Sequence, residues 1–457
     1  MPKETLKNLK ETKEGGKLKM KKCLKTKNGI TLIALVVTIV VLLILAGVSI
    51  SLVVDKNGII QKSKDARREY GQAKANEQED LSNLSDMIEE ATAEPPPKVD
   101  VNTKAGDNST INGKKGNSNN PTIPKNYIPI DTATSTWGDG STAPSQDSVN
   151  HGLVIKDEKN NEWVWIPVDK ATLATMYEES SDEKTLCGTT GETAVKTKLY
   201  SKSEIISGKT RTTPGTSTSG SYREPDLVVG NDGAKYDAKD TFYKTILGET
   251  GTKEQLAQLF ADEYKAMIES VSKYGGFYIG RYELSEAGVQ KDKATLTNTN
   301  WYNLYKKCKE LNASDKVETR MIWGCQWDVT MNWLISSGAK TSNEVNKDSS
   351  SWGNYSDSKE NAKVTVTEED GTTTNKYGRK QNTGYSEYWK ANNIYDLAGN
   401  CWEWTQEAHN TNLRANRGGY YSFNGSVFPA SHRNDGYNPD NSGNDYVRFS
   451  SYFNNKI

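Results

Sequence analysis

The strongest constraint on this chain is a run of uncharged residues near its N-terminus. From Ile30 to Val54 the sequence is almost entirely Val, Ile and Leu and contains no charged residue. A helix of this length spans about 37 Å at roughly 1.5 Å per residue, and a bilayer core is about 30 Å thick. A buried core helix of that length normally carries a polar face, and this run has none. The segment 30–54 therefore predicts a membrane-spanning helix.

The charges on either side of this segment predict its orientation. The first 28 residues contain ten Lys and three Glu, and Asp55 follows the apolar run. Lysine-rich flanks stay on the cytoplasmic side. We expect a single-pass protein of the cell membrane with a basic cytoplasmic leader (1–29), a cytoplasmic N-terminus and an extracellular C-terminal domain. The formal net charge of −1 favours no nucleic-acid partner.

The start of the apolar run has a more specific pattern. The sequence from Lys27 to Val36, with Gly29 directly before the hydrophobic residues, resembles the type IV prepilin leader. The resemblance implies a prepilin peptidase as partner, cleavage after Gly29 and Ile30 as the new N-terminus. The family usually has Glu at the fifth mature position, where this chain has Ala34. A minor pilin-like subunit of a filament and an ordinary signal-anchor helix are both alternatives.

The region after the membrane segment changes character twice. Asp55 to Ala93 is polar and free of Pro, and it predicts a solvated continuation of the helix, so that one unit covers 30–93. Three consecutive prolines after Glu94 end it. Residues 94–125 are mostly Asn, Gly, Ser, Thr and Lys and predict a flexible linker.

The outer domain, 126–457, has a mixed pattern. Short aromatic and β-branched runs at 162–167 and 276–283 predict strands. Apolar residues at helical spacing predict helices over 252–273, with a Thr252/Gln255 capping box and a stop at Gly275, and over 300–311. Polar insertions at about 180–240 and 341–382 have lengths typical of display or disorder. Together these features predict an α+β fold with long insertions.

The cysteines give no clear framework. Four of the five, Cys187, Cys308, Cys325 and Cys401, follow the apolar run without regular spacing. Two disulfides and buried thiols are both consistent with such spacing. Cys308 lies on the apolar face of the helix predicted over 300–311, which favours a core position.

Residues 393–405 contain a recognisable motif. The sequence NIYDLAGNCWEWT is similar to the signature of the formylglycine-generating-enzyme (sulfatase-modifying factor) domain. The segment 276–283 and the triplet 417–419 fall where that family has counterparts. The resemblance covers about 126 to the C-terminus, leaves the insertions unmatched, and implies a fold of C-type-lectin kind.

The same comparison argues against catalysis. The sulfatase-modifying enzymes use a pair of cysteines near the C-terminus, and this chain has none after Cys401. Its three histidines, His151, His409 and His432, lack the spacing of the related iron-dependent enzymes, and without a placed histidine base no triad is available. We expect a protein that is not an enzyme, with a sulfatase-modifying activity as the third hypothesis.

A structural calcium ion is a further implication of the resemblance. In the family, the loop that carries this motif helps bind calcium through a glutamate and backbone carbonyls, which correspond here to Glu403, Gly399 and Cys401. Calcium prefers such oxygen ligands. Glu403 as a capping or salt-bridging core residue is the alternative.

The segment 420–447 has an unusual composition. It is rich in Tyr, Asn, Ser, Asp, Gly and Phe and contains no Lys, Glu, Gln, Met or Trp. Tyr supplies rigid amphipathic contact area at low entropy cost, and small polar residues supply adaptable hydrogen bonds. This composition favours a ligand-binding surface. A turn-rich end of the fold with partly buried aromatics is the alternative.

The same limits are typical of the variable proteins of diversity-generating retroelements. Adenine-directed mutagenesis of AAC-type codons yields residues of this kind but no Lys, Glu, Gln, Met or Trp. By this resemblance the variable segment is 416–449, with fixed points at 417–419, 429–431, Arg433, 439–440 and 448–449. The expected ligand-binding residues are Tyr420, Tyr421, Phe423, Asn424, Phe428, His432, Asn434, Asp435, Tyr437, Asn438, Asn441, Asn444, Asp445 and Tyr446. The sequence thus predicts a surface receptor or adhesin for a protein or glycan ligand outside the cell.

Overall fold

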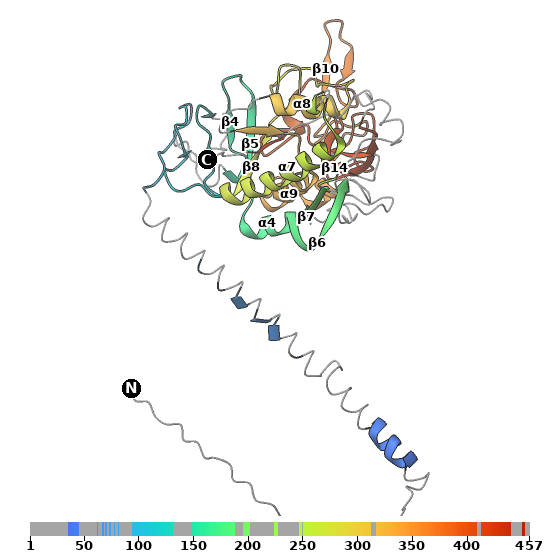
Figure 1. Ribbon diagram of the computed structural model, residues 1–457. Helices are drawn as coiled ribbons and strands as arrows, with labels where there is room; N and C mark the ends of the chain where they lie inside the picture. The colour runs from blue at the N-terminus through green and yellow to red at the C-terminus, as the bar shows by residue number, and fades with distance from the viewer. Residues whose placement is uncertain are drawn as a thin grey trace, which may run out of the picture. The chain divides into compact units, whose positions relative to one another are not determined.

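The computed structural model (Figure 1) divides into two compact units, Met1–Ala93 and Glu94–Ile457. In the first unit it describes residues 35–44 and nine single positions from 62 to 81. In the second unit it describes residues 94–130, 149–187, 195–201, 224–226, 246–248, 250–311, 317–408, 413–439 and 450–452. Some side chains within these ranges, such as that of Cys187, are also outside the description.

In the first unit the described residues are helical. Residues 35–44 form a helix whose side chains are exposed, and the described positions between 62 and 81 are helical as well. Gly29, Ile30 and most of the segment 30–54 lie outside the described residues. Within the described part of the chain, no helix has both the length and the apolar character needed to span a bilayer.

The second unit is an α+β domain built on an antiparallel six-stranded sheet. Its strand order is β3-β4-β5-β8-β17-β9. The strands are β3 (Ile128–Pro129), β4 (Val154–Lys156), β5 (Glu162–Pro167), β8 (Gly276–Gly280), β17 (Ser450–Tyr452) and β9 (Glu318–Arg320). The predicted strand at 162–167 is confirmed, and the one predicted at 276–283 ends at Gly280. Chain segments from both ends of the unit therefore meet in one sheet.

Strands β5 and β8 lie at the centre of this sheet and pair in register, with Trp165 opposite Tyr278. Their rings lie 4.9 Å apart between centroids. Every residue of β8 is buried, so both faces of the strand are covered. This explains why the sequence of β8 is apolar without the alternation of a half-exposed strand.

The two predicted helices are confirmed at their ends as well as their centres. Helix α7 (Lys253–Tyr274) begins with the reciprocal capping box of Thr252 and Gln255, and it ends at Gly275 with φ of +74°. Helix α8 (Trp301–Glu310) begins at the N-cap Asn300. Cys308 on α8 is fully buried, and burial raises the pKa of its thiol well above the ordinary value.

A third long helix, α9 (Gly324–Ser336), was not predicted from the sequence. Ten of its residues are buried, including the run from Gly324 to Met331. A helix covered on nearly all sides has no polar face, and its sequence therefore lacks the periodicity that reveals an amphipathic helix. Its N-cap residue, Trp323, also belongs to a type that is rarely favoured at that position.

The segment 94–125, expected to be a flexible linker, is packed onto the domain instead. It forms the short pair β1 (Ser109–Thr110) and β2 (Thr122–Ile123). Val99, Ile111 and Ile123 are almost fully buried in the same apolar cluster as Trp165 and Tyr278. A few well-spaced apolar side chains were enough to attach a segment whose overall composition is that of a linker.

The insertion 341–382 also differs from the expectation of display or disorder. It contains helix α10 (Ser342–Asn346) and the hairpin of β10 (Thr365–Thr367) and β11 (Thr373–Asn375), which projects from the domain (Figure 1). Between these elements, Trp352 and Tyr355 are buried in a second apolar cluster, which also contains Ile279 of β8. Only the hairpin fits the expectation of display.

The remaining elements lie outside the six-stranded sheet and the three longer helices. They are helix α4 (Lys170–Met176), the hairpin of β6 (Tyr177–Cys187) and β7 (Val195–Ser201), the 3-10 turn η2 (Glu387–Trp389), and the pair β12 (Lys390–Ala391) and β13 (Ile394–Tyr395). A separate antiparallel sheet, β14 (Glu403–Ala408), β15 (Arg414–Arg417) and β16 (Arg433–Tyr437), carries the C-terminal segment. Cys308, Cys325 and Cys401 are fully buried.

Candidate ligand-binding surface

The C-terminal segment is organised by the three-stranded sheet. Strand β15 pairs with β14 on one side and β16 on the other, which places Arg417 opposite both Glu403 and Arg433. The loop 418–432 joins β15 to β16 and carries six of the fourteen residues expected to bind a ligand. The position of this loop is therefore fixed by the end of β15 at Arg417 and the start of β16 at Arg433.

A closed ring of four buried charges ties these strands to helix α9. Arg433 contacts Asp328 through Nη2 at 2.6 Å and Glu407 through Nε at 2.6 Å. Arg417 contacts Glu407 at 3.4 Å and also pairs with Asp328. All four side chains are 0–1% exposed. We call Asp328, Glu407, Arg417 and Arg433 the charge ring.

The charge ring is stable only when all four of its members are present. Each guanidinium has two carboxylate partners, so the four charges balance inside a region that water does not reach. Removing one member of a buried pair leaves an uncompensated charge, which typically costs about 3–5 kcal/mol. The ring therefore holds α9, β14, β15 and β16 in one arrangement rather than adding a large net stability.

The backbone of the loop is fastened by groups from the insertion 341–382. The buried Tyr355 hydroxyl lies within hydrogen-bonding distance of two carbonyls, those of Gly418 at 2.8 Å and Phe428 at 2.9 Å. Burial raises the pKa of Tyr355 well above its usual range, so the hydroxyl keeps its proton and remains a donor. The Gly425 N–H donates to Asp357 at 2.8 Å. Because these anchors hold main-chain atoms, they do not depend on which side chains the loop displays.

Steric crowding explains why one position of the loop, 419, is a glycine. Gly419 has φ of +89°, and a Cβ added there would lie 2.5 Å from the Phe428 carbonyl oxygen and 2.8 Å from the Tyr355 ring. The left-handed backbone and the close approach both exclude a larger residue. Gly419 therefore belongs to the support of the loop.

Aromatic side chains form a continuous row along this loop. Tyr421, Tyr420, Phe423, Phe428 and His432 contact one another in that order, with centroid separations of 4.1 Å, 5.8 Å, 4.9 Å and 4.9 Å. Trp402, which is 2% exposed, lies 5.4 Å from Phe428 and 6.0 Å from His432. We call these six residues the aromatic row.

Exposure separates the loop into two sets. The points expected to be fixed are buried where they are described, at 417–419, 429–431, Arg433 and Pro439. Phe423 is 43% exposed and Asn424 is also exposed. Six more of the expected binding residues are partly exposed: Tyr420, Tyr421, Phe428, His432, Asn434 and Asn438. Each described residue of the expected binding set thus has surface available to a ligand.

The remaining expected residues are not brought into the site by the described structure. Asp435 and Tyr437 lie on strand β16, but their side chains fall outside the described part. Asn441, Asn444, Asp445 and Tyr446 lie wholly outside it. Their roles remain predictions.

Sequence reasoning missed several residues at this surface. The Ser356 hydroxyl lies 3.0 Å from the carbonyl of Phe423 and 2.9 Å from the side-chain oxygen of Asn424. Val427 is 56% exposed beside them. No local pattern connects Ser356 to residues 67 and 68 positions later. Only the folding of the insertion brings them together.

The predicted calcium residues lie beneath this surface. The Gly399 N–H donates to the Gly418 carbonyl at 2.8 Å, and the Cys401 N–H donates to Glu283 at 3.1 Å. Glu403 is fully buried on β14. Among the residues that the structure describes, no group of three or more His, Cys, Asp or Glu side chains is arranged to hold a metal ion. Calcium binding by backbone carbonyls and Glu403 remains a prediction.

Comparison of the chain with models of protein families, with curated proteins and with solved structures finds no match in any of the three. The structure therefore defines the fold class, which is α+β. It also shows a loop rich in aromatic residues, 418–432, that the charge ring and the Tyr355 hydroxyl hold in place.

Proposed function

We propose that this chain is a non-catalytic ligand-binding protein of the cell surface, a receptor or adhesin. Residues 126–457 adopt a C-type-lectin-like fold of the formylglycine-generating-enzyme kind, behind a membrane-spanning, prepilin-like N-terminal segment. The binding surface is the aromatic row with its flanking asparagines, and the segment 416–449 is diversified by a retroelement.

The observation that carries the proposal is the division of the loop by exposure. The charge ring, the Tyr355 hydroxyl and Gly419 hold the backbone of the loop, while Asn424 and the members of the aromatic row other than the buried Trp402 are at least partly exposed. Substitutions at exposed positions away from such anchors usually change stability by less than about 0.5 kcal/mol. This arrangement supports a loop whose displayed side chains can change while its backbone stays in place.

The chemistry of the displayed set supports a binding role as well. Partly exposed aromatic rings in contact with one another offer apolar area whose geometry is already set, so little rotamer entropy remains to be lost on binding. Asn424 and Asn434 beside the row each provide donors and acceptors. A protein or glycan with an apolar face and polar edges is the ligand class that fits such a surface.

The first test is the sequence of the codons for 416–449 in many sibling isolates. The proposal expects changes at the outward positions of the aromatic row and at the flanking asparagines. It expects no changes at the charge-ring arginines or at 418–419. An invariant segment, without a neighbouring reverse transcriptase and template repeat, would remove diversification from the proposal.

The second test is selection of a displayed peptide library on the purified full chain. Binders should be lost when Phe423→Ser is introduced and kept when Tyr388→Ser is introduced. Tyr388 is a suitable control because it is 63% exposed and lies outside the aromatic row. A library that yields only binders insensitive to Phe423→Ser would contradict the proposed surface.

A further inference from the structure

The loop 418–432 concentrates the exposed apolar side chains of the second unit. Within the described part of that unit, three large hydrophobic side chains are exposed: Phe423 at 43%, Val427 at 56% and Tyr388 at 63%. Two of the three belong to this loop. A single exposed apolar residue is ordinary on a protein surface, whereas two in one short loop beside the aromatic row are typical of an interaction surface.

The loop carries almost no charge. Its sequence contains no Lys, Arg, Asp or Glu, and His432 is its one basic residue. Asp357, from the insertion 341–382, contacts the loop, but its carboxylate accepts the Gly425 N–H at 2.8 Å. A strongly charged partner would lose hydration at this surface without gaining a counter-charge. The loop therefore favours an uncharged partner.

Several polar groups around Phe423 are already paired within the protein. The Phe423 carbonyl accepts the Ser356 N–H at 3.1 Å, and the Ser356 hydroxyl lies 3.0 Å from it. The same hydroxyl donates to the side-chain oxygen of Asn424 at 2.9 Å. The Asn424 carbonyl accepts the N–H groups of Val427 and Phe428 at 3.1 Å and 3.0 Å. A glycan binds through many hydroxyl groups, and this part of the loop offers them fewer donors and acceptors than its Ser- and Asn-rich sequence suggests.

Neighbouring rings of the aromatic row are tilted rather than parallel. The angles between successive ring planes from Tyr421 to His432 are 44°, 58°, 48° and 85°. A sugar ring stacks its flat C–H face on an open aromatic face, and tilted neighbours in contact reduce the flat area that each ring offers. The edges between tilted rings instead give branched aliphatic side chains many close contacts. The geometry of the row therefore favours apolar side chains over sugar rings.

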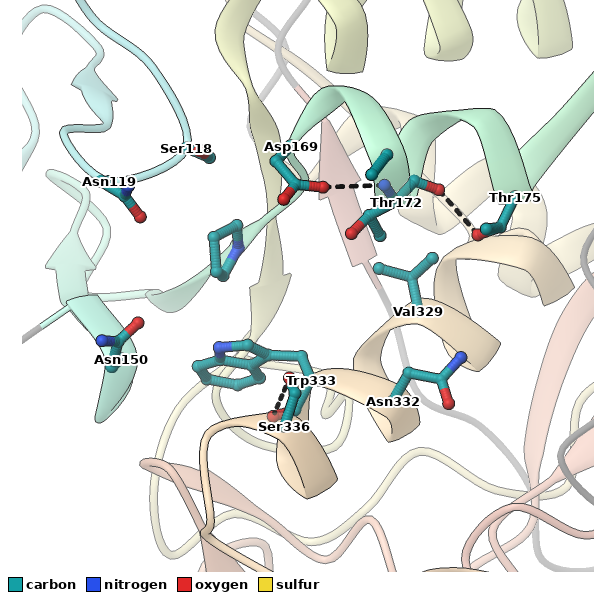
Figure 2. Close-up of a pocket in the computed structure, with 12 residues that line it drawn as sticks. Ser118, Asn119, Asn150, Asp169, Thr172, Thr175, Val329, Asn332, Trp333 and Ser336 are labelled. Atoms are coloured by element: carbon teal, nitrogen blue, oxygen red, sulfur yellow. Dashed lines mark hydrogen bonds between the residues drawn. The ribbon is translucent and has the colours of Figure 1, made fainter.

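A hollow on another part of the domain has the opposite character (Figure 2). It lies between α4, α9 and the loop at 118–119, and its volume is about 510 Å³. Seven of its twelve lining residues are Ser, Thr or Asn, and none belongs to the aromatic row or the charge ring. We call it the polar hollow. Because the two places share no residue, a substitution of Asn332 in the polar hollow can serve as a control for binding at the loop.

We infer that the aromatic row, together with Phe423 and Val427 as its most exposed apolar contacts, binds an uncharged, apolar stretch of a polypeptide outside the cell rather than a glycan. Leu, Ile or Val side chains of that stretch fit between the tilted rings, and its backbone amides meet the Asn424 carboxamide. This inference rests on the proposed function and adds the class of partner to it.

The test uses the purified full chain in phospholipid nanodiscs and two sets of probes. One set is a displayed random peptide library, and the other is an array of neutral and sialylated oligosaccharides. Phe423→Ser and Val427→Ser each remove exposed apolar surface from the loop. Tyr388→Ser removes an exposed ring elsewhere, and Asn332→Ala changes the polar hollow, so both are controls. Thermal melting checks that each variant is folded, and the two loop variants keep the test decisive if one of them is not.

The selected peptides should be rich in Leu, Ile, Val and Phe and have little net charge. Their Kd should rise about tenfold or more in Phe423→Ser and about threefold or more in Val427→Ser, and it should stay unchanged in both controls. Raising the salt concentration about tenfold should change this Kd by less than about twofold, because few charges take part.

The inference is overturned if the selected peptides are strongly charged and lose affinity as salt rises. It is also overturned if only oligosaccharides bind in a manner that depends on Phe423, a result that would keep the proposed function and make the ligand a glycan. Binding that Asn332→Ala abolishes would place the ligand in the polar hollow and contradict the inference. If no probe of either set depends on Phe423, the proposed binding surface fails together with the inference.

Discussion

The central sheet and the three-stranded sheet bury their side chains in different ways. Strands β5 and β8 bury aromatic and aliphatic residues, so that the contacts between them are numerous and without direction. Strands β14 to β16 bury three arginines, and Asp328 and Glu407 neutralise two of them, Arg417 and Arg433. Apolar packing tolerates small changes of shape, whereas a buried ion pair fails when one partner leaves. The loop 418–432 is thus held by the charge ring at its ends and by hydrogen bonds to its main-chain atoms. These contacts do not involve the exposed side chains of the loop.

The largest effect should come from breaking the charge ring. Asp328→Ala leaves the two buried arginines with Glu407 as the one remaining carboxylate of the charge ring, so that one positive charge is uncompensated, and we expect a loss of about 3–5 kcal/mol in the free energy of unfolding. Chemical denaturation of the full chain measures it. Glu369→Ala, in the exposed turn of the β10–β11 hairpin, is the control and should cause no measurable change. Equal stability of the two variants would show that the ring does not hold the sheet.

Next comes the backbone of the loop. Gly419→Ala places a methyl group against the Phe428 carbonyl in a left-handed conformation, and we expect a loss of about 1–3 kcal/mol. The comparison is Gly371→Ala in the β10–β11 turn, which has φ of +81° but no atom within 4 Å of the added Cβ. The difference between the two melting transitions isolates the steric contact from the backbone strain. A larger loss at Gly371 would contradict the tight fit at Gly419.

A small apolar substitution in the central sheet should lower the free energy of unfolding by less than a change in the charge ring. Ile279→Val on β8 removes one buried methylene group, and such changes cost about 0.5–1.5 kcal/mol. The same denaturation experiment applies. A loss as large as that expected for Asp328→Ala would erase the distinction between the two sheets.

Phe423→Ser should have a still smaller effect on stability, within about 0.5 kcal/mol, because the side chain is 43% exposed and no loop anchor depends on it. The same variant should lose ligand binding. Thermal melting and the peptide selection separate these two outcomes. Unfolding of this variant would mean that the aromatic row supports the fold rather than displaying a surface.

The smallest effect concerns charges at the surface. Burial raises the pKa of Glu387, but hydrogen bonds from Lys390, Tyr395 and Lys291 outweigh it and lower the pKa from 4.5 to about 2. A lowered pKa in the folded state stabilises above about pH 4.5, and this contribution is lost as the pH falls toward 2. Glu387→Gln should therefore melt slightly earlier than wild type at pH 7, with the gap closing toward pH 2. A gap that widens in acid would contradict this sign.

The candidate site was only partly accessible to sequence reasoning. The composition of 420–447 indicated the exposed residues of the loop. The residue types that suit an exposed position depend on the chemistry of each side chain, so they can be recognised without knowing which residues lie nearby in the fold. The supports were not accessible in this way. Asp328 lies 105 residues before Arg433, and Tyr355 lies 63 before Gly418. Such pairs leave no local pattern, and a charged or hydroxyl residue is ordinarily taken for a surface position.

The amino-acid sequence by itself determined the elements that depend on near neighbours. Helices α7 and α8 have their caps and apolar faces within one short window each, and β5 is bounded by its own turn residues. Tertiary structure alone decided that α9 is a helix, that 94–125 packs against the core, and that the insertion 341–382 holds the loop 418–432 in place. In each of these cases the stabilising contacts come from distant parts of the chain, and their energy outweighs the weak preference of the local composition.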